Sequence, residues 1–498
     1  MEERYIAAVD LGSSKIAITV AKVTGNDIQI QYYKETPSAG IRNSAVFNPM
    51  QASGPIKEVI ESAEKELSIK ILQVVVGLPK CDVRQESNSA AATRVSPDEC
   101  ISEEEVEALK ILAQENYPNI SAREELYGAV AQSFDCDDDF QMVENEVVGM
   151  VSEAITGNFK LFIGKKSATK TIDNVFTKMG IAIAKKYFTP ESMAKAVLTE
   201  DEKDAGVALI DFGGGSTSVT IYKGKILRHY ASIPFGGINI TEDIKTESRS
   251  SLSLSENIKK AFGACMPERL LTLSEKIIQI DGEEGTNGPK QIPVKYLSEI
   301  ITARAAEIIN AMLWEIQESG LSEALRSGIV ITGGGANLGN IATFVKELSG
   351  YEVRIGIPRP LFTTTGCSSV RTPSATTCLG MILAAKSDTL LNCVEPAEIF
   401  DDEEEIEVVT TEEVEEAPQP VEEIFEEGPS IPEGADEGET ADLFGREEAP
   451  VIEPEKKKGG KKPKPVKEHK ERKPNFINIT WAKVMNKIEN MYDNAGNE

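Results

Sequence analysis

The chain lacks most of the side chains on which histidine, zinc and disulfide chemistry depends. Its 498 residues include two histidines, His229 and His469, and seven cysteines that form no CxxC motif and do not cluster near either histidine. Zinc sites and histidine-based catalysis are therefore poorly supported, and the odd number of scattered cysteines indicates a reducing compartment. We expect the cysteines to be buried small apolar side chains, and His229 to be a strand residue with a structural hydrogen bond.

Long hydrophobic runs are also missing. No stretch of about 18 apolar residues occurs, and the start, MEERYIAAVDLG, has no basic segment followed by an apolar one. We therefore expect a chain that is neither exported nor membrane-spanning. Only 6% of the residues are aromatic, whereas 40% are hydrophobic, which favours an α/β interior rich in alanine and isoleucine.

The negative charge is concentrated near the C-terminus. The net charge is −28, and residues 395–455 hold 25 acidic side chains and one basic one, whereas residues 456–473 hold ten basic and two acidic ones. The first 394 residues carry only −11, which gives no reason to expect a globular nucleic-acid binder. Residues 396–473 are rich in Glu, Pro and Gly, cannot bury enough apolar surface to fold, and are predicted to form a disordered tether.

Two similar segments lie 201 positions apart. Residues 7–21 read AAVDLGSSKIAITVA, and residues 208–222 read ALIDFGGGSTSVTIY. Each has an apolar run ending in aspartate, a Gly/Ser loop and a second run of β-branched residues. This predicts a β-hairpin rather than the strand-to-helix passage of a P-loop or a Rossmann fingerprint. A single loop of this kind is often a plain turn, but its duplication favours a phosphate-binding hairpin in each half.

A third glycine cluster follows an apolar strand in GIVITGGGANLGNIATFVKEL, residues 328–348. The apolar residues after the glycines recur at helical spacing: Leu338, Ile341, Phe344, Val345 and Leu348. We expect the strand to pass through Gly333, Gly334 and Gly335 into a helix. Amides at such a helix start favour an anion or a nucleotide, although the same cluster serves equally well as a tight turn.

The two hairpins and the later strand–GGG–helix, in this order, resemble the phosphate 1, phosphate 2 and adenosine motifs of the actin/Hsp70/sugar-kinase superfamily. Residues 196–244, which contain DFGGGSTSVTIYKGKILRHY, are similar almost position by position to the central block of the FtsA family of bacterial cell-division proteins. SENIKKAFG (255–263) resembles that family's nucleoside-packing helix, and residues 144–164 resemble the end of its 1C subdomain. The resemblance covers residues 5–390 and implies an α/β, actin-like (ribonuclease-H-like) duplicated fold with a 1C insertion and a disordered C-terminal tail.

The resemblance also implies subdomain boundaries. Subdomain 1A would comprise residues 1–81, 168–187 and a closing helix at 375–395, with the 1C insertion at 82–167. Subdomain 2A would comprise residues 188–240 and 328–374, with subdomain 2B at 241–327. The linker at 396–473 and an amphipathic helix at 474–498 would follow.

A nucleotide cleft between the halves is implied as well. Asp10 and Asp211 would face each other and hold a hydrated Mg²⁺ together with the phosphates of ATP. The residues implied at the phosphates are Gly12, Ser13, Ser14 and Lys15 from one side and Gly213, Gly214, Gly215, Ser216 and Thr217 from the other. Glu256 and Lys259 share a helix face and would reach the ribose and the adenine, or else form an ordinary surface ion pair. The residues implied to close over the nucleoside are Gly333, Gly334, Gly335 and Ala336.

Hydrolysis requires a further residue. Relatives that hydrolyse ATP carry a polar or acidic residue before the second phosphate hairpin, where it orients the attacking water. The candidates in YFTPESMAKAVL (187–198) are Thr189 and Glu191, and we assign Glu191 to the catalytic set with Asp10 and Asp211. Because neither candidate clearly occupies the expected place, we predict ATP binding with slow or absent turnover.

The last segment of the chain is amphipathic. In FINITWAKVMNKIENMY (476–492) the apolar residues recur at helical spacing: Phe476, Ile477, Trp481, Val484, Met485, Ile488, Met491 and Tyr492. Next to the basic residues 456–473, this pattern predicts a helix that lies in the interface of an anionic membrane. Docking of the helix onto the globular part or into a partner's groove is the alternative.

The resemblance implies a division scaffold. The chain would bind ATP and anchor the ring of the tubulin-like FtsZ to the cytoplasmic face of the cell membrane at the division site, as a peripheral protein. Its partners would be the C-terminal peptide of FtsZ on subdomain 2B, copies of itself in filaments, later division proteins and anionic lipid, but no nucleic acid. A pilus-assembly adaptor of the same type and a small-molecule kinase on the same fold are the alternatives.

Overall fold

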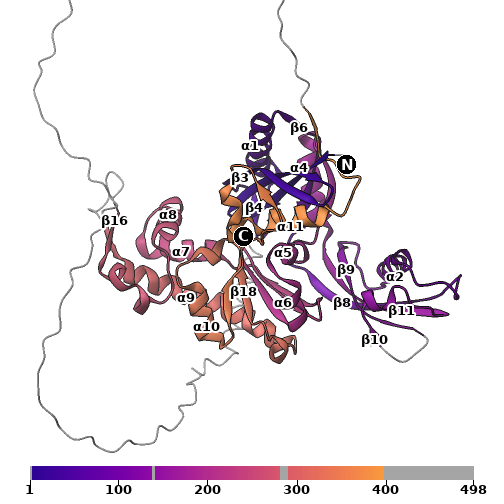
Figure 1. Ribbon diagram of the computed structural model, residues 1–498. Helices are drawn as coiled ribbons and strands as arrows, with labels where there is room; N and C mark the ends of the chain where they lie inside the picture. Colours follow the sequence, from indigo (N-terminus) through magenta and orange to yellow (C-terminus); the bar gives the residue numbers. More distant parts are fainter. Residues whose placement is uncertain (1–2, 137–140, 281–289, 397–498) are drawn as a thin grey trace, which may run out of the picture. The chain divides into compact units, whose positions relative to one another are not determined.

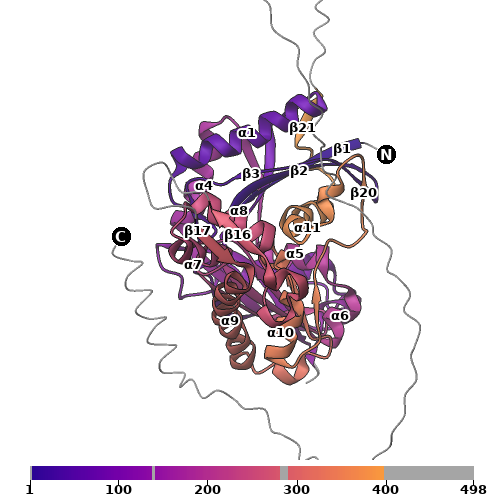
Figure 2. The same ribbon diagram turned by 90° about the vertical axis from the view of Figure 1, so that its left-hand side faces the viewer.

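The computed structural model describes residues 3–136, 141–280 and 290–396. They form two topologically similar halves, each built on a sheet, with an insertion in the first half (Figures 1 and 2). The predicted tether beyond residue 396 and the predicted amphipathic helix at 474–498 lie outside the described residues.

The first half contains a six-stranded sheet with the order β12-β7-β1-β2-β3-β20. Its strands are β1 (Glu3–Leu11), β2 (Lys15–Thr24), β3 (Asp27–Pro37), β7 (Gln73–Gly77), β12 (Ala182–Tyr187) and β20 (Thr363–Thr364). β1, β2 and β3 form an antiparallel meander, whereas β7 runs parallel to β1 and β12 runs parallel to β7. The helices α1 (Pro49–Leu67) and α11 (Thr376–Ala385) lie on opposite sides of the meander (Figure 2), which explains the near-continuous apolar runs of β1 and β2.

The second half repeats this topology. Its five-stranded sheet has the order β15-β14-β13-β18-β19, with β13 (Val207–Phe212), β14 (Thr217–Lys223), β15 (Ile226–Ile233), β18 (Ile329–Thr332) and β19 (Val353–Ile355). β13, β14 and β15 form the meander, and β18 and β19 continue the sheet in parallel. The two predicted hairpins are therefore confirmed as β1–β2 and β13–β14, and the fold is actin-like.

The helices of the second half and of its connections are α5 (Thr189–Val197), α6 (Glu200–Ala205), α7 (Gly237–Ser248), α8 (Leu252–Phe262), α9 (Val294–Glu318) and α10 (Ile341–Ser349). α7 and α9 share an apolar core with the inner strands β13 and β14. A second core is made largely by β1, β2, α1 and α11 of the first half, and it extends to the second sheet through Leu209 on β13 and Val330 on β18. One core thus lies on the outer face of the second sheet, and the other joins the two halves.

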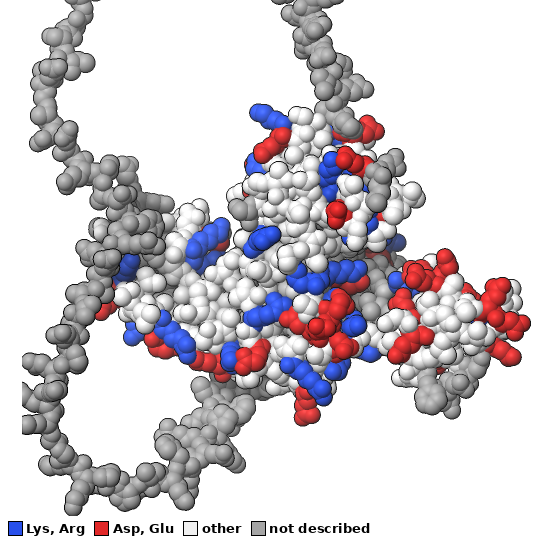
Figure 3. Space-filling model, in the orientation of Figure 1, with Lys and Arg blue, Asp and Glu red and all other residues white. Residues whose placement is uncertain are grey.

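The insertion is a four-stranded sheet with the order β10-β9-β11-β8 and with its own apolar core. Its elements are β8 (Arg84–Thr93), α2 (Glu103–Glu115), β9 (Glu124–Asp135), β10 (Gln141–Met142), α3 (Glu144–Val147) and β11 (Ala154–Lys165). α2 begins with a capping box between Ser102 and Glu105 and ends before Pro118, as the acidic helix-start signal predicts. On the face shown in Figure 3 the charged side chains of this insertion are mostly acidic.

Shorter elements complete the chain. They are β4 (Ile41–Arg42), β5 (Ala45–Val46), β6 (Ile69–Ile71), α4 (Lys166–Lys178), η1 (Pro267–Arg269), η2 (Leu271–Glu275), β16 (Ile277–Ile280), β17 (Lys290–Pro293), η3 (Ser322–Ala324), η4 (Gly334–Asn337), η5 (Ser368–Arg371), η6 (Pro373–Ala375) and β21 (Val394–Pro396). β4 pairs with β5, β6 with β21, and β16 with β17. Among the described helices, none is both long and apolar enough to cross a bilayer.

The third glycine cluster folds differently from the prediction. β18 ends at Thr332, but the glycines then form the 3-10 turn η4, and α10 begins only at Ile341. Between them Gly339 makes an isolated bridge to Ala264 and donates its amide to the carbonyl of Gly263 at 3.0 Å. This bridge diverts the chain before the helix starts, so the glycine amides belong to a turn and not to the start of α10.

Two smaller expectations have mixed outcomes. His229 lies on β15, and its Nδ1 is 2.8 Å from the side-chain nitrogen of Gln85 on β8, so the structural hydrogen bond is confirmed. All seven cysteines are free thiols; four of them are buried, but Cys100 is exposed. The burial expectation is therefore wrong for Cys100, which lies just before Ser102, the N-cap of α2, and Cys136 and Cys367 are only partly buried.

An aromatic cluster joins the insertion to both halves and predicts a large loss of stability on truncation. Phe162 on β11 stacks on Phe188, which precedes α5, with ring centroids 4.5 Å apart, and its edge meets Tyr230 on β15. Phe162→Ala should lower the free energy of unfolding by about 3–5 kcal/mol, because it removes a fully buried ring at a joint that is packed on all sides. Urea denaturation followed by circular dichroism measures the change, with Phe162→Leu as a milder control. A loss within the range of surface substitutions, about 0.5 kcal/mol, would contradict this role.

Candidate functional site

The turns of the two hairpins touch each other. A side chain built at Gly214 would place its Cβ 2.6 Å from the Cβ of Ser14, and one at Gly215 would lie 2.6 Å from the hydroxyl of Ser13. From the neighbouring β4–β5 turn, the hydroxyl of Ser44 lies 2.7 Å from that of Ser216. Only glycine allows this approach, because a Cβ at either position would force the two turns apart.

A cavity of about 680 Å³ lies between the halves at these turns. Fifteen of the predicted site residues line it: Asp10, Gly12, Ser13, Ser14, Lys15, Asp211, Gly213, Gly214, Gly215, Ser216, Glu256, Lys259, Gly333, Gly334 and Gly335. Its volume is in the range of small-molecule and cofactor sites. The structure therefore gathers into one cavity residues that lie more than 300 positions apart in sequence.

Three predicted residues do not line the cavity. Thr217 follows Ser216 on β14, but its hydroxyl donates to the carbonyl of Phe235 at 2.8 Å, because successive strand residues point to opposite faces. Ala336 is buried within η4, and its neighbour Asn337 lines the cavity instead. Glu191 lies on an exposed side of α5, with its carboxylate 3.7 Å from Lys195. The catalytic assignment to Glu191 is thus corrected: its helix turns the side chain away from the site.

Thr189 reaches the cavity where Glu191 does not. It is the first residue of α5, lines the cavity, and is almost fully buried. Its hydroxyl has no hydrogen-bond partner among the described residues. Because a buried hydroxyl usually finds a partner, an atom of a bound molecule or a water would be expected beside it.

The two carboxylates sit with a lysine that sequence analysis did not find. Lys80 donates from its ammonium to the carboxylate of Asp211 at 2.6 Å, and the two side chains are 13% and 8% exposed. Burial by itself would lower the pKa of Lys80, but the carboxylates of Asp211 and Asp10 raise it above its ordinary value. Burial raises the pKa of Asp10; Lys80 and Lys15 oppose this shift, and Asp211 adds to it. The group thus consists of the carboxyl groups of Asp10 and Asp211 and the ammonium of Lys80, whose charges interact strongly because they have little contact with solvent.

A signal for Lys80 was present in the sequence. The run QVVVG (73–77) is a buried strand, and Leu78-Pro79-Lys80 follows it directly. Because β7 pairs parallel to β1, with Val76 opposite Val9, both strands end at the same edge of the sheet, where Asp10 lies. A polar residue after a buried strand parallel to β1 was therefore a candidate for the same site.

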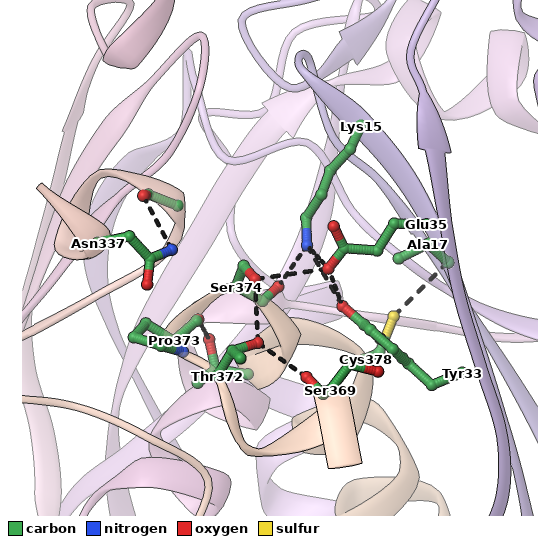
Figure 4. Close-up of polar contacts among 12 residues, drawn as sticks. Lys15, Ala17, Tyr33, Glu35, Asn337, Ser369, Thr372, Pro373, Ser374 and Cys378 are labelled. Carbon is green, nitrogen blue, oxygen red and sulfur yellow. Dashed lines mark hydrogen bonds and ion pairs between the residues drawn. The ribbon is translucent and has the colours of Figure 1, made fainter. Parts of the chain in front are cut away.

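Lys15 is held by neighbours of its own. Its ammonium contacts the carboxylate of Glu35 and the hydroxyl of Tyr33 on β3, and donates to the carbonyl of Ser374 at 3.0 Å (Figure 4). Burial would raise the pKa of Glu35, but the ammonium of Lys15 outweighs it and lowers the pKa. Lys15 thus ties β2 and β3 to the segment before α11 at the rim of the cavity.

Glu256 and Lys259 form more than a surface ion pair. Lys259 lies 2.7 Å from Glu256 on α8, and it also donates to the carbonyl of Gly237 at 2.8 Å and to the hydroxyl of Thr241 on α7 at 2.7 Å. Burial lowers the pKa of Lys259. The pair therefore fixes α8 against the start of α7, with both side chains lining the cavity.

The third glycine cluster faces the second carboxylate. Gly333 has φ +83°, and a Cβ there would collide with the carboxylate of Asp211, whereas Gly335 lies flat against the ring of Phe212. A left-handed conformation with no space for a side chain requires glycine. The turn that follows β18 therefore closes one wall of the cavity around Asp211.

The donor set fits a phosphate-bound Mg²⁺ and not a metal held by protein alone. Among the described residues no group of three or more histidine, cysteine, aspartate or glutamate side chains could hold a metal ion. Two carboxylates, Asp10 and Asp211, lie beside glycine turns that a Cβ would fill. Mg²⁺ typically takes one or two carboxylates, several waters and substrate phosphates, so the residues present fit this ion together with an anion bound at the turns.

The contact of the two turns predicts a specific stability effect. Gly214→Ala should destabilise the protein by about 1–3 kcal/mol, because its Cβ would overlap the Cβ of Ser14. Adding Ser14→Gly removes the opposing Cβ, so the double variant should recover most of the loss. Thermal unfolding of the single and double variants measures this coupling. If Ser14→Gly gives no recovery, the two turns are not in contact in solution.

The comparisons with known proteins agree on one family. A family model described as "Cell division protein FtsA" matches residues 208–380. The cell division protein FtsA of Neisseria meningitidis serogroup B is 31% identical over 389 residues, which cover 77% of this chain and 91% of that protein. The FtsA proteins of Pseudomonas aeruginosa and Bacillus subtilis are 26% and 24% identical, and the alignments cover 89% and 83% of their lengths.

A solved structure supports the fold. A chain of the "PilM-PilN type IV pilus biogenesis complex" superposes with a TM-score of 0.55 at 15% sequence identity, covering 76% of this chain and 98% of that chain. At this identity the likeness concerns the fold alone. With a relative that is 31% identical over nearly its whole length, the chain belongs to the FtsA family of bacterial cell-division proteins.

Proposed function

We propose that this chain is an ATP-binding, actin-like scaffold that links the FtsZ ring to the cytoplasmic face of the cell membrane at the division site. The observation that carries the nucleotide part is the cavity between the two hairpin turns, with one aspartate from each half, of which Asp211 is buried and Asp10 is partly buried. Backbone amides at such turns bind phosphate oxygens, and the cavity is large enough for a nucleotide. Membership of the FtsA family supports the link to division.

Each wall of the cavity has a role in this proposal. The turns at residues 12–15 and 213–216 hold the phosphates, and Asp10 and Asp211 hold Mg²⁺, which neutralises phosphate charge when bound. Glu256 and Lys259, already fixed against α7, position the ribose and the base. Gly333, Gly334 and Gly335 form the wall beside the nucleoside. The binding site is thus pre-organised by contacts that exist without the ligand.

Turnover is proposed to be slow or absent. A general base would need a free carboxylate near the terminal phosphate, yet Glu35 and Glu256 are engaged with lysines and Glu191 lies outside the cavity. The hydroxyl of Thr189 is placed to orient a water but is too weakly basic to take its proton. This arrangement favours a nucleotide that is bound and retained. It also argues against the alternative of a small-molecule kinase, because among the described residues the cavity offers no free glutamate that could act as the general base.

The nucleotide site is tested by removing one charge. Asp211→Asn should weaken binding of ATP in the presence of Mg²⁺ by about tenfold or more, since an ion-mediated contact is worth more than about 1.4 kcal/mol. Glu191→Gln, outside the cavity, should leave the affinity unchanged. Titration of a fluorescent ATP analogue gives the affinities, and phosphate release from the same samples gives the turnover. Equal affinity in the wild type and Asp211→Asn would refute the site, and turnover at the rate of metabolic kinases would refute the scaffold.

The proposed anchor lies outside the described residues and rests on the sequence. The apolar residues from Phe476 to Tyr492 share one helix face, and each large side chain contributes at most about 1.5–3 kcal/mol on burial. The basic stretch at 456–473 adds attraction to anionic lipid. The acidic residues 395–455 are repelled by the same surface and would keep the globular part away from it.

The partner surfaces are proposed as well. Subdomain 2B, residues 241–327, would take the C-terminal peptide of FtsZ, and the described part of it exposes apolar side chains, including Leu271, Ile277 and Tyr296. α9, which carries Tyr296, packs on η2, which carries Leu271. Exposed apolar side chains of this kind favour a protein partner. Copies of the chain itself in filaments and later division proteins would be further partners, and no nucleic acid is expected.

Membrane binding is tested by changing one face of the C-terminal helix. Trp481→Glu with Met485→Glu should abolish co-sedimentation with anionic vesicles, because both charges fall on the apolar face, and deletion of 475–498 should do the same. Asn490→Glu, on the opposite face of the helix, is the matched control and should retain most of the binding. Recruitment of fluorescent FtsZ to a supported bilayer by the same variants with ATP then tests the link to the ring. Unchanged sedimentation of the deletion variant would eliminate the anchor.

A further inference from the structure

Lys80 has a fixed position in the wall of the cavity. Its segment leaves β7 with the amide of Leu78 donating to the carbonyl of Tyr187 at 2.8 Å, and the carbonyl of Lys80 accepts from the hydroxyl of Tyr230 at 2.5 Å. The next residue, Cys81, contacts the carbonyl of Ile233 through its sulfur at 3.6 Å. The backbone on both sides of Lys80 is therefore fixed by hydrogen bonds, and this backbone position directs its ammonium toward Asp211.

Among the lysines that line the cavity, Lys80 is the one that pairs with Asp211 in the described part of the chain. The other lysines that line the cavity have glutamate partners: Lys15 contacts Glu35, and Lys259 and Lys260 contact Glu256. Asp211 is paired with Lys80 within the described part of the chain. An unpaired carboxylate at this depth would be costly, so Lys80 supplies the positive charge that Asp211 needs while no metal is bound.

We propose that Lys80 is a built-in counter-cation that occupies Asp211 in the metal-free protein and must give up this carboxylate before a divalent cation can take it. This inference rests on the proposed nucleotide site. A divalent ion and an ammonium cannot share one carboxylate oxygen at 2.6 Å without strong repulsion. Lys80 therefore lowers the affinity of the empty cavity for a bare metal ion. When the metal arrives with a nucleotide, the phosphates bring negative charge into the cavity. The ammonium of Lys80, displaced from Asp211, can then remain in the cavity beside these phosphates.

The proposal requires that removal of the ammonium strengthens binding of metal alone. Full-length, nucleotide-free protein is titrated with MnCl₂, and free Mn²⁺ is measured by electron paramagnetic resonance. Lys80→Met should bind Mn²⁺ about tenfold more tightly than the wild type, because the carboxylates of Asp211 and Asp10 then lack the positive charge of Lys80. Lys80→Arg keeps the charge and should resemble the wild type. Lys260→Met removes another cavity-lining ammonium, one paired with Glu256, and should also resemble the wild type.

Two further variants keep the test decisive. Lys80→Gln can still donate a hydrogen bond to Asp211, so it serves if Lys80→Met does not fold, and it should show the same gain. The double variant Lys80→Gln with Asp211→Asn should lose this gain in Mn²⁺ affinity. The acidic residues 395–455 are the same in every variant, so any Mn²⁺ that they bind does not contribute to the difference. The proposal is overturned if neutral variants at Lys80 bind Mn²⁺ no more tightly than the wild type, or if the gain persists without Asp211.

Titration of the wild type with fluorescent ATP tests the proposed function separately. A gain in Mn²⁺ binding by the Lys80 variants without ATP binding by the wild type would refute only the proposed function. ATP binding by the wild type without a gain in Mn²⁺ binding would refute only the role of Lys80.

Discussion

The close approach of the Gly213–Gly215 turn, which carries no side chains, to the turn at Ser13 and Ser14 is the constraint on which the site depends. Each half of the molecule ends its first strand with an aspartate and turns at once through small residues, and the turns then meet with Gly214 against Ser14 and Gly215 against Ser13. Duplicated topology alone would give two separate hairpins. The absence of Cβ atoms at the meeting point is what places Asp10 and Asp211 at one cavity. The fold of each half thus determines where the carboxylates point, and the glycines determine that they point at the same space.

The cavity is lined by charges that are already paired with one another. Lys15 with Glu35 joins the first sheet to the segment before α11, Lys259 with Glu256 joins α8 to α7, and Lys80 with Asp211 joins the two halves. Buried pairs of this kind contribute little net stability, but the loss of one partner is costly. A charged ligand must therefore exchange partners with these groups. For the proposed ligand, this would favour binding of a complete metal–nucleotide complex over binding of either component alone.

The sequence predicted the parts of the site that repeat and missed the part that depends on pairing between distant strands. The hairpins, their aspartates and the strand before the third glycine cluster follow from local patterns, because alternating β-branched residues around a Gly/Ser loop favour one structure. Thr217 and Ala336 were predicted because they adjoin residues that line the cavity, yet the two-residue period of a strand and the tight 3-10 turn direct them away from it. Lys80 could not be found from spacing, since its partner Asp211 is 131 residues away in the other half, and only the parallel pairing of β7 with β1 places Lys80 at the edge where Asp10 lies. Glu191 was assigned to the catalytic set and Thr189 was not, whereas position on α5 decides that Thr189 is the one that reaches the site.

Tyr230 connects the cavity to the insertion through contacts of a single residue. Its hydroxyl donates to the backbone carbonyl of Lys80, and its backbone amide donates to the side-chain oxygen of Gln85 on β8. Its ring packs against Phe162 and Phe188. The ring is almost fully buried, and a close-packed interior has little space in which to absorb a shift. A displacement of the segment around Lys80 must therefore be matched by β15, by the first residues of β8, or by both. The insertion is mechanically joined at its base to the cavity between the two halves, and this joint is built from the same residue that fixes Lys80.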